Sequence, residues 1–482
     1  MASLNGEFSY IDNQNFSLGW VTAVPAHVIE DGGTPNVQNV DFSESFGRLT
    51  KRRGHSLYMN ANAGGSTKVC GLYQYIQEDA DEFILAASND DVYNCTPAST
   101  WTSIHTAAGL NGADVQFTTF NNLAIFVSVN LTTQKWTGSG SSSNLGGTPP
   151  SNAKFIDSHK RRVFIANTSA GTNRLHYSAL DNPEDWTTSG DAGFIDIGLG
   201  DGDHITGLAS LGTILLIFKK RSVWALYGSA PSNYSVRQLS PSVGCAGHKT
   251  IVKCDKFAIF LSYDGVYTAN SDGVAFVSYN IKPTIDALTT SARPIAAAGK
   301  LRTQYWLAVD TDADGINDEV YILDYVLGIW FRYTNKKENV FCRLANGTLL
   351  SGGSDTDVIR THDTTNNDNG SAITMVWDTK DYDGGDFTRL KRLHDFIAVG
   401  YPITGKTITI SHLVNGIVQG TTMTWTLTPV STEDKVYFNR RHLPATSFGA
   451  YFRFRLTNAE TDANIKVFAY SVKVALEERA NG

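Results

Sequence analysis

Short apolar segments that alternate with small polar turns recur along most of the chain, and this recurrence limits the possible folds more than any other feature. About seven such units lie between residues 66 and 365, one every ~30 to 50 residues. In residues 256–270 (KFAIFLSYDGVYTAN), for example, an apolar strand leads through a turn to a second strand that carries Tyr. A period of this length in a chain of strands is typical of a solenoid or a propeller.

One unit indicates how the units pack together. Residues 214–218 (ILLIF) form an uninterrupted apolar run, which is typical of a strand covered on both faces, as in stacked propeller blades. We therefore predict an all-β protein in which residues 66–365 form a β-propeller of about seven blades. A set of irregular β-sandwiches remains an alternative, because the units share a pattern and not identical residues.

The length and a change of strand character predict further domains. The chain has 482 residues, whereas single hydrophobic cores stop growing near ~250 to 300 residues. A Ser/Gly/Asn-rich stretch at residues 361–372 is typical of a domain boundary, and the strands after it alternate strictly, as in residues 452–456 (FRFRL). We expect a C-terminal β-sandwich over residues 370–482. Residues 1–65 are expected to form an N-terminal arm and docking segment that joins the propeller.

The charge balance argues against a protein that grips nucleic acid. With 40 basic and 47 acidic side chains, the net charge is -7, whereas a phosphate-binding surface needs a broad excess of Lys and Arg. The N-terminus lacks a signal-peptide pattern and no run approaches the ~20 apolar residues of a membrane span, so we expect synthesis in the cytoplasm. The five cysteines are scattered, which favours buried free thiols over disulfides or a zinc site.

Residues 178–186 (SALDNPEDW) are the stretch closest to a sugar-binding or catalytic motif. They are similar to the Asp-box turn of sialidase-like propellers, although Pro183 stands where that turn has Gly. Hydrogen bonds between the nearby backbone and the side chain of Asp181 or Asn182 explain these residue types without chemistry. A retaining glycosidase needs two carboxyls ~5 Å apart, and a sequence cannot show that two of them converge. We predict a structural corner and no catalytic residue.

One acidic loop has the pattern of a calcium site. Asp310, Asp312 and Asp314 alternate ahead of a glycine, as in loops that gather hard oxygen ligands around one cation. Asp318 follows as a further possible ligand. The twelfth position of the loop is Tyr321 and not the bidentate Glu of an EF-hand, and a polar hairpin loop is expected here in any case. Calcium is the only cofactor that the sequence suggests, and a plain hairpin loop remains the alternative.

Three basic clusters are candidates for contacts with a neighbouring molecule. In an acidic protein, local basic sites can pair with acidic patches on another subunit, although such clusters are usually just solvated. The middle cluster is expected at a hairpin tip. The candidate interface residues are Lys51, Arg52, Arg53, Lys219, Lys220, Arg221, Arg389, Lys391 and Arg392.

Three segments of the chain, taken in order, resemble one protein family. Residues 36–54, residues 174–186 with 201–228, and residues 376–400 resemble the tail nozzle, or tail stabilisation, proteins of short-tailed bacteriophages. The resemblance implies a β-propeller body with added β-domains, six copies in a ring below the portal and adaptor, and a central channel for DNA. It implies no catalytic residue and no cofactor. Some nozzle proteins are much longer than this chain and carry extra domains.

The function expected from this resemblance is structural. The chain would be a virion protein, assembled in the host cytoplasm, whose homohexamer forms the distal DNA channel and retains and then releases the genome. Its partners would be itself, the adaptor or portal-side tail proteins, and a tail fibre or needle. DNA would pass without specific binding, which an acidic lumen favours if enough of the negative charge faces inward. The alternative from another class is a tail-associated, sialidase-like propeller that binds or cleaves glycans.

Overall fold

The protein is built almost entirely from strands, as predicted. The computed structural model describes residues 8–43, 47–59, 68–95, 101–106, 110–356, 358–386, 388–428, 437–443 and 447–476. No helix in these ranges is both long and apolar enough to cross a membrane. The helical segments are α1 (Lys282–Asp286), α2 (Ala292–Ile295) and three 3-10 turns, Pro231–Asn233, His248–Thr250 and Tyr279–Ile281.

Seven four-stranded antiparallel sheets make up the larger part of the described residues. The first three sheets contain β8 (Val69–Ile76), β9 (Glu82–Ser88), β10 (Asp91–Asn94) and β11 (Thr102–Thr106); β12 (Gln116–Phe120), β13 (Leu123–Val127), β14 (Gln134–Trp136) and β15 (Ser143–Asn144); and β16 (Phe155–His159), β17 (Arg162–Thr168), β18 (Gly171–Tyr177) and β19 (Gly193–Asp196). The fourth and fifth contain β20 (Ile205–Leu211), β21 (Ile214–Lys219), β22 (Val223–Tyr227) and β23 (Ser235–Ser240), then β24 (Val252–Cys254), β25 (Phe257–Leu261), β26 (Val266–Ala269) and β27 (Val274–Phe276). The last two contain β28 (Ala297–Leu301), β29 (Gln304–Val309), β30 (Glu319–Asp324) and β31 (Ile329–Thr334), then β32 (Glu338–Arg343), β33 (Leu349–Gly353), β34 (Ile359–His362) and β7 (His55–Met59).

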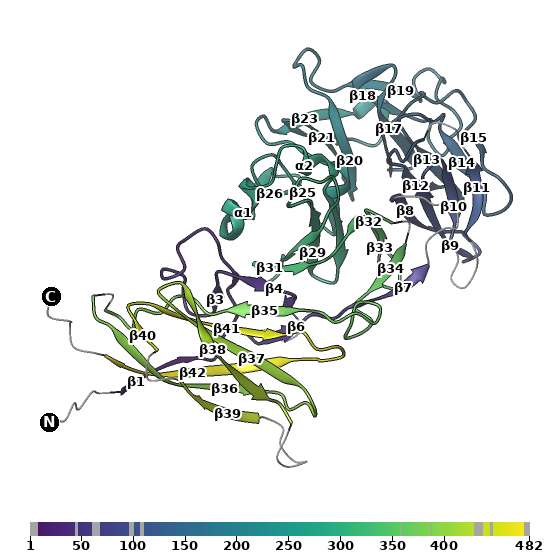
Figure 1. Ribbon diagram of the computed structural model, residues 1–482. Coiled ribbons are helices and arrows are strands. Elements are labelled where there is room, and N and C mark those ends of the chain that lie inside the picture. The colour runs from purple at the N-terminus through teal and green to yellow at the C-terminus, as the bar shows by residue number, and fades with distance from the viewer. Residues whose placement is uncertain are drawn as a thin grey trace, which may run out of the picture.

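The seven sheets form a closed circle of the propeller type (Figure 1). The first strand of each sheet contacts the first strand of the next, and β32 of the seventh sheet contacts β8 of the first. The seventh sheet takes its fourth strand, β7, from the N-terminal part of the chain, where His55 lies opposite His362 of β34. The ring is therefore closed by backbone hydrogen bonds between segments about 300 residues apart in sequence.

Stacking of neighbouring sheets explains the apolar run in β21. Its side chains alternate in direction: Leu215 and Ile217 pack with Phe164 of the third sheet, whereas Leu216 and Phe218 pack with Phe260 of the fifth. All four are fully buried, and burial of each such side chain contributes about 1.5 to 3 kcal/mol. A strand between two sheets therefore carries apolar residues at consecutive positions, as the sequence predicted.

Two further sheets lie beside the ring and contain the C-terminal strands (Figure 1). One has the order β39-β36-β42-β6-β5, with β1 also paired to β42 and β40 to β36; the other has the order β38-β37-β41-β35-β4. Their facing sides are in contact, since Phe396 and Phe454 have ring centroids 4.6 Å apart. The strands are β1 (Phe8–Asn13), β4 (Val37–Gln38), β5 (Val40–Asp41), β6 (Leu49–Lys51), β35 (Met375–Asp378), β36 (Lys391–Gly400), β37 (Thr407–Val414), β38 (Ile417–Thr426), β39 (Tyr437–His442), β40 (Phe448–Gly449), β41 (Phe452–Asn458) and β42 (Lys466–Leu476).

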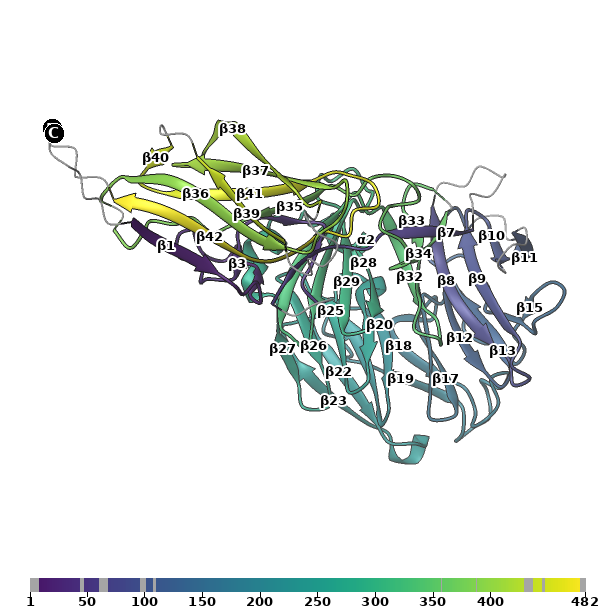
Figure 2. The same cartoon turned by 90° about the horizontal axis from the view of Figure 1, so that it is seen from below.

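The N-terminal segment joins the ring to these two sheets (Figure 2). Strands β4 and β5 extend one sheet each and also contact β31 of the sixth sheet of the ring. Strand β2 (Gly19–Trp20), which pairs in parallel with β3 (Gly33–Thr34), contacts β31 as well. Phe42 packs on Phe331 with ring centroids 5.9 Å apart, and Trp20 packs on Tyr321 at 5.3 Å. One continuous hydrophobic core therefore spans the junction.

The five cysteines are free thiols, in agreement with the sequence. Cys70, Cys95, Cys245 and Cys254 are buried and Cys342 is partly buried. Burial raises the pKa of each of these thiols, to about 11 for Cys70 and Cys254, so they are protonated and unreactive at neutral pH.

Candidate functional site

The acidic corner that follows β18 joins two sheets of the ring. The Glu184 carboxylate accepts hydrogen bonds from Lys135 Nζ at 2.7 Å and from the Gly146 backbone N–H at 2.8 Å, both in or next to the second sheet. The Trp186 side chain is 8 % exposed and packs in the core between the second and third sheets. Its indole N–H donates to the Pro183 carbonyl at 2.8 Å. The corner therefore acts as a structural contact between neighbouring sheets.

The remaining carboxylates of this corner also have local partners. Asp181, at a positive φ of 56°, forms an ion pair with Arg161. Asp185 accepts hydrogen bonds from the side chain and backbone of Thr188, and these bonds lower the pKa of Asp185. The hydrogen bond from Lys135 likewise lowers the pKa of Glu184. A glycosidase general acid needs a carboxyl with a raised pKa, which neither Glu184 nor Asp185 has.

The acidic loop between β29 and β30 gathers three of its four predicted ligands. One carboxylate oxygen each of Asp310, Asp312 and Asp314 lies within 4.8 Å of the other two. Both oxygens of Asp310 already accept backbone N–H groups, from Ala313 at 2.7 Å and Gly315 at 2.9 Å. Asp318 is turned instead toward Thr311, whose backbone N–H and hydroxyl donate to it. The arrangement is compatible with a small hard cation and equally with a hydrogen-bonded hairpin loop.

Four of the nine candidate interface residues are buried inside the chain. Lys51 Nζ donates to Asn458 Oδ1 at 2.6 Å, and burial lowers the pKa of Lys51 to about 8. Lys219 Nζ donates to both oxygens of Asp201 and is fully buried. Lys391 Nζ donates to the backbone carbonyls of Asp386, Arg389 and Ala450, and Arg52 belongs to the buried cluster described below. Each of these cations therefore already has partners within its own chain.

The other five candidates reach the surface at least in part. Lys220 and Arg221 are exposed in the turn between β21 and β22, at the predicted hairpin tip. The Arg221 guanidinium donates to the backbone carbonyls of Asp201 and Gly202 at 3.3 Å. Arg53, Arg389 and Arg392 are partly exposed.

A cavity of about 270 Å³ lies at the centre of the ring. The first strand of every one of the seven sheets contributes to its lining, including Leu72 of β8, Phe117 of β12 and Phe341 of β32. Side chains from all seven sheets therefore converge on the centre of the ring.

The charged groups at this cavity are paired across sheets. Lys253 Nζ lies 3.1 Å from Asp157 Oδ2, and Asp157 also accepts the Ser210 backbone N–H at 2.8 Å. Lys249 Nζ contacts Asp114 at 3.3 Å and Asn339 at 2.8 Å. Burial disfavours the charged form of Asp114, but Lys249 outweighs it and lowers the pKa of the carboxyl. Among the described residues, no cavity-lining side chain is left as a buried polar group without a partner.

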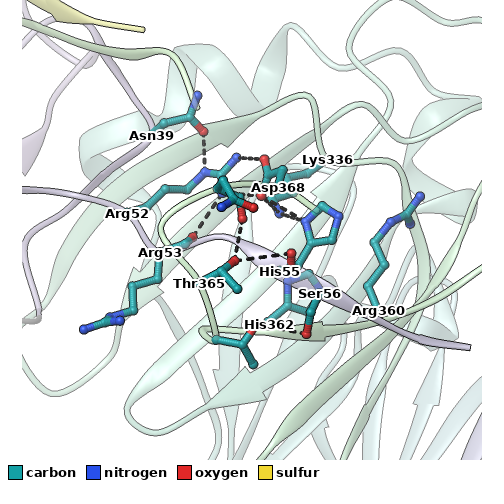
Figure 3. A network of polar contacts seen from close by, with 12 residues as sticks. Asn39, Arg52, Arg53, His55, Ser56, Lys336, Arg360, His362, Thr365 and Asp368 are labelled. Atoms are coloured by element: carbon teal, nitrogen blue, oxygen red, sulfur yellow. Dashed lines mark hydrogen bonds and ion pairs between the residues drawn. The ribbon is translucent and has the colours of Figure 1, made fainter. Parts of the chain in front are cut away.

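A second group of buried charges lies where the N-terminal segment, the ring and the chain leading to β35 meet (Figure 3). Arg52 donates to both oxygens of Asp368, at 2.9 and 2.5 Å, and to Asn39 Oδ1 at 2.6 Å. Lys336 Nζ lies 3.1 Å from Asp368 and 2.8 Å from His55 Nδ1. Burial opposes ionisation of Asp368, but Lys336 and Arg52 outweigh it and hold its pKa well below the usual range.

A buried Ser–His–Glu group extends this cluster into the seventh sheet. Ser351 Oγ donates to Glu338 Oε2 at 2.5 Å and lies 2.6 Å from His362 Nε2. In a hydrolase triad the histidine stands between the serine and the acid, whereas here the acid contacts the serine directly. All three side chains are at most 3 % exposed. The group therefore lacks both the order and the access of a catalytic triad.

Sequence reasoning missed most of this buried cluster. Only Arg52 was among the candidates, as part of a basic run expected near the surface. Asp368 stands in the Ser/Gly/Asn-rich stretch 361–372, where the composition indicates only a linker. Lys336 precedes a strand in the short charged run Lys336-Lys337-Glu338, and such a run is usually just solvated. No signal in the sequence brings together residues 52, 336 and 368, because their contacts depend on ring closure.

Comparison with known proteins gives no sequence family for the chain. No family model matches it, and no curated protein matches it. Similar solved structures include a streptogramin B lyase, at 12% identity and a TM-score of 0.46, over 65% of this chain and 98% of that chain. The Neurospora crassa Pan2 WD40 domain has 10% identity and a TM-score of 0.40, over 66% and 96%. BBS1N in complex with ARL6DN has 11% identity and a TM-score of 0.45, over 64% and 97%. Similarity at this level leaves the function to be argued from the residues of this chain.

Proposed function

We propose that the protein is a structural virion component, the subunit of a homohexameric tail nozzle of a short-tailed bacteriophage. In this proposal the seven four-stranded sheets are the blades of one propeller, and the two sheets containing the C-terminal strands form a β-sandwich. Six copies surround the distal DNA channel below the portal and adaptor, and the protein performs no reaction. The resemblance of three sequence segments to nozzle proteins is the origin of the proposal.

The observation that carries the proposal is what these three segments do in the fold. Residues 36–54 supply β4, β5 and β6, which extend both sheets beside the ring. Residues 174–186 end in the corner that joins the second and third sheets. Residues 376–400 cover most of β35 and all of β36, which belong to the two opposed sheets. Segments that join one sheet or domain to another suit a rigid wall. In a family of enzymes, the resemblance would instead be expected at catalytic residues.

The size of the central cavity bears on where DNA would pass in this proposal. A volume of about 270 Å³, with Asp157 and Lys253 paired at its wall, cannot admit a duplex. The channel would therefore lie between copies of the chain and not along the axis of each ring. The protein would hold the packaged genome until the host is met, without sequence-specific contacts to the DNA. Adaptor or portal-side proteins, and a fibre or needle, would contact the two ends of this channel.

Imaging of intact particles that contain this chain tests the proposal. A sixfold ring on the tail axis, with density that fits the closed circle of sheets, is the expected result. Threefold spikes, or isolated copies of the chain at the periphery of the particle, would overturn it.

The alternative function, cleavage of glycans by the propeller, is tested by a different measurement. Release of reducing sugar from host polysaccharide by the purified chain, abolished by Glu184→Gln, would favour that function. Since Glu184 joins two sheets, the unfolding midpoint of the variant must be compared with that of the parent chain before any loss of activity is interpreted.

A further inference from the structure

One face of the seven-stranded sheet carries an unusual set of exposed side chains. The strand register places Phe8, Ala475, Arg392 and Phe448 in one row across four strands. The next row of the same face contains Tyr10, Lys473, Asp395 and His442. Phe8, Tyr10 and Phe448 are 50%, 56% and 48% exposed, which is high for aromatic side chains on a sheet. The opposite side of the sheet packs against its partner sheet through Phe396.

The charge that this face presents to solvent is mainly positive. The Arg440 and His442 side chains are 48% and 79% exposed, whereas Asp395, which they contact, is 3% exposed. Lys473 Nζ lies 3.8 Å from the centroid of the Phe8 ring. Asp12, further along β1, is an exposed carboxylate of the same face. We call the surface formed by Phe8, Tyr10, Arg440, His442, Phe448 and Lys473 the aromatic face.

A complementary surface exists at the turn between β8 and β9 of the ring. Glu78, Asp79, Asp81 and Glu82 are all exposed there, and none of them forms an ion pair within the described part of the chain. Ile76, at the start of this acidic turn, is 37% exposed and adds an apolar group. The negative charge of these four carboxylates complements the cations of the aromatic face, and the exposed isoleucine complements its aromatic rings.

The two surfaces cannot meet within one molecule. Strands β1, β36, β39 and β42, which carry most of the aromatic face, lie at one end of the molecule in both views, whereas β8 and β9 of the ring lie at the other end (Figure 1, Figure 2). A contact between them joins one copy head to tail with the next. Such a heterologous contact closes into a ring when the rotation per copy allows it.

We propose that the aromatic face binds the acidic β8–β9 turn of a second copy of this chain. The inference rests on the proposed function and deepens it, because it names the surfaces that hold the ring together. Nucleic acid is the other anionic occupant that such a face could take. It is less favoured because stacking needs open ring faces, and Phe8 already has Lys473 over its ring and His394 against it at 4.8 Å.

Charge reversal in the full chain tests the contact. The face variant is Phe448→Glu/Lys473→Glu, and the turn variant is Asp79→Lys/Asp81→Lys. Sedimentation velocity over a range of protein concentrations should show self-association of the parent chain that weakens with salt. Each variant should lose about tenfold or more in association constant, and the chain that carries all four changes should regain it. Glu30→Lys/Asp272→Lys, which makes the same change of net charge as the turn variant at other exposed sites, should associate like the parent chain.

Several outcomes would overturn this contact. One is a parent chain that stays monomeric at every concentration and salt level. Another is association that the face and turn variants leave unchanged while their circular dichroism matches that of the parent. Binding of a fluorescent single-stranded oligonucleotide that only the face variant loses would assign the face to nucleic acid instead. A sixfold ring in particles made with the face variant alone, or with the turn variant alone, would reject this contact and leave the nozzle function standing.

Discussion

Arg52 and Asp368 form a two-pronged ion pair inside the protein, although 316 residues separate them in sequence. The Arg52 side chain is 1% exposed and that of Asp368 is 15% exposed. The pair ties the N-terminal segment to the chain that leaves the ring, and Lys336 of the ring contacts the same carboxylate. Three parts of the protein therefore share one negative charge.

Removal of this charge should be strongly destabilising. Asp368→Asn leaves the buried Arg52 without its ion-pair partner and removes the carboxylate that Lys336 contacts, and loss of one partner of a buried pair costs about 3 to 5 kcal/mol. The free energy of unfolding from urea titration measures the effect. Asp181→Asn, which breaks the exposed pair with Arg161, is the control and should cost less than about 1 kcal/mol. If both variants lose the same free energy of unfolding, the buried pair contributes no more to stability than the exposed one.

Stability should fall in acid through Glu338. Burial opposes its ionisation, but Arg360, His362 and Lys336 lower its pKa to about 2, below the ordinary value of 4.5. A carboxyl with a depressed pKa in the folded state stabilises the protein above pH 4.5, and this contribution, about 3 kcal/mol, is lost as the pH falls toward 2. Urea titrations at several pH values should show the loss. In Glu338→Gln the slope over this pH range should be shallower, and an unchanged slope would contradict the assignment.

The corner contact can be tested with two glycines of opposite surroundings. A Cβ at Gly147, where φ is 72°, would lie 1.8 Å from the Glu184 carbonyl oxygen. At Gly190, where φ is 82°, it would meet nothing within 4 Å. Gly190→Ala should therefore cost only the backbone strain, about 1 to 2 kcal/mol, and Gly147→Ala should cost clearly more. Thermal unfolding of both variants measures the difference. Equal midpoints would show that the corner around Glu184 can move to accommodate the added Cβ without loss of stability.

If the acidic loop binds calcium, a single substitution in it should weaken the effect of the ion on stability. Desolvation within the loop raises the pKa of Asp312, although its side chain is exposed, and the nearby carboxylates of Asp314, Asp318 and Asp310 raise it further. Asp312→Asn removes like-charge repulsion, so its unfolding midpoint in EDTA should be at least that of the parent chain. If the loop binds calcium, the ion should raise the midpoint of the parent and raise that of the variant less. No calcium effect on the parent would leave a plain hairpin loop.

Local patterns predicted the elements of this fold better than the contacts between them. The apolar run 214–218 predicted a strand covered on both faces, and both neighbouring sheets do cover it. The alternation in residues 452–456 predicted one buried and one exposed face, and Phe452, Phe454 and Leu456 are buried. Both signals lie within a few residues of the chain, where side-chain direction follows backbone geometry.

Such local patterns could not predict contacts between residues that are far apart in the sequence. Lys51 looked like part of a solvated basic run, but its ammonium group contacts Asn458, which is 407 residues away. Lys219 sits at the predicted hairpin tip but turns inward to Asp201. A run of basic residues shows the positions of the cations in the sequence. It does not show which of them contact hydrogen-bond acceptors inside the folded protein. The calcium loop and the interface residues at the surface stay predictions for the same reason, because their partners would come from outside the chain.

The strand β7 has a consequence for the order in which the protein can fold during synthesis. Residues 55–59 leave the ribosome early, yet their partner strand β34 ends at residue 362. Strand β1 must wait longer, since it pairs with residues 470–475. The N-terminal segment therefore remains without its partners while the sheets between are made, and it is exposed to chaperones and proteases during that time. A truncated chain that stops before β34 cannot complete the seventh sheet, so only products that extend to residue 362 or beyond can close the ring.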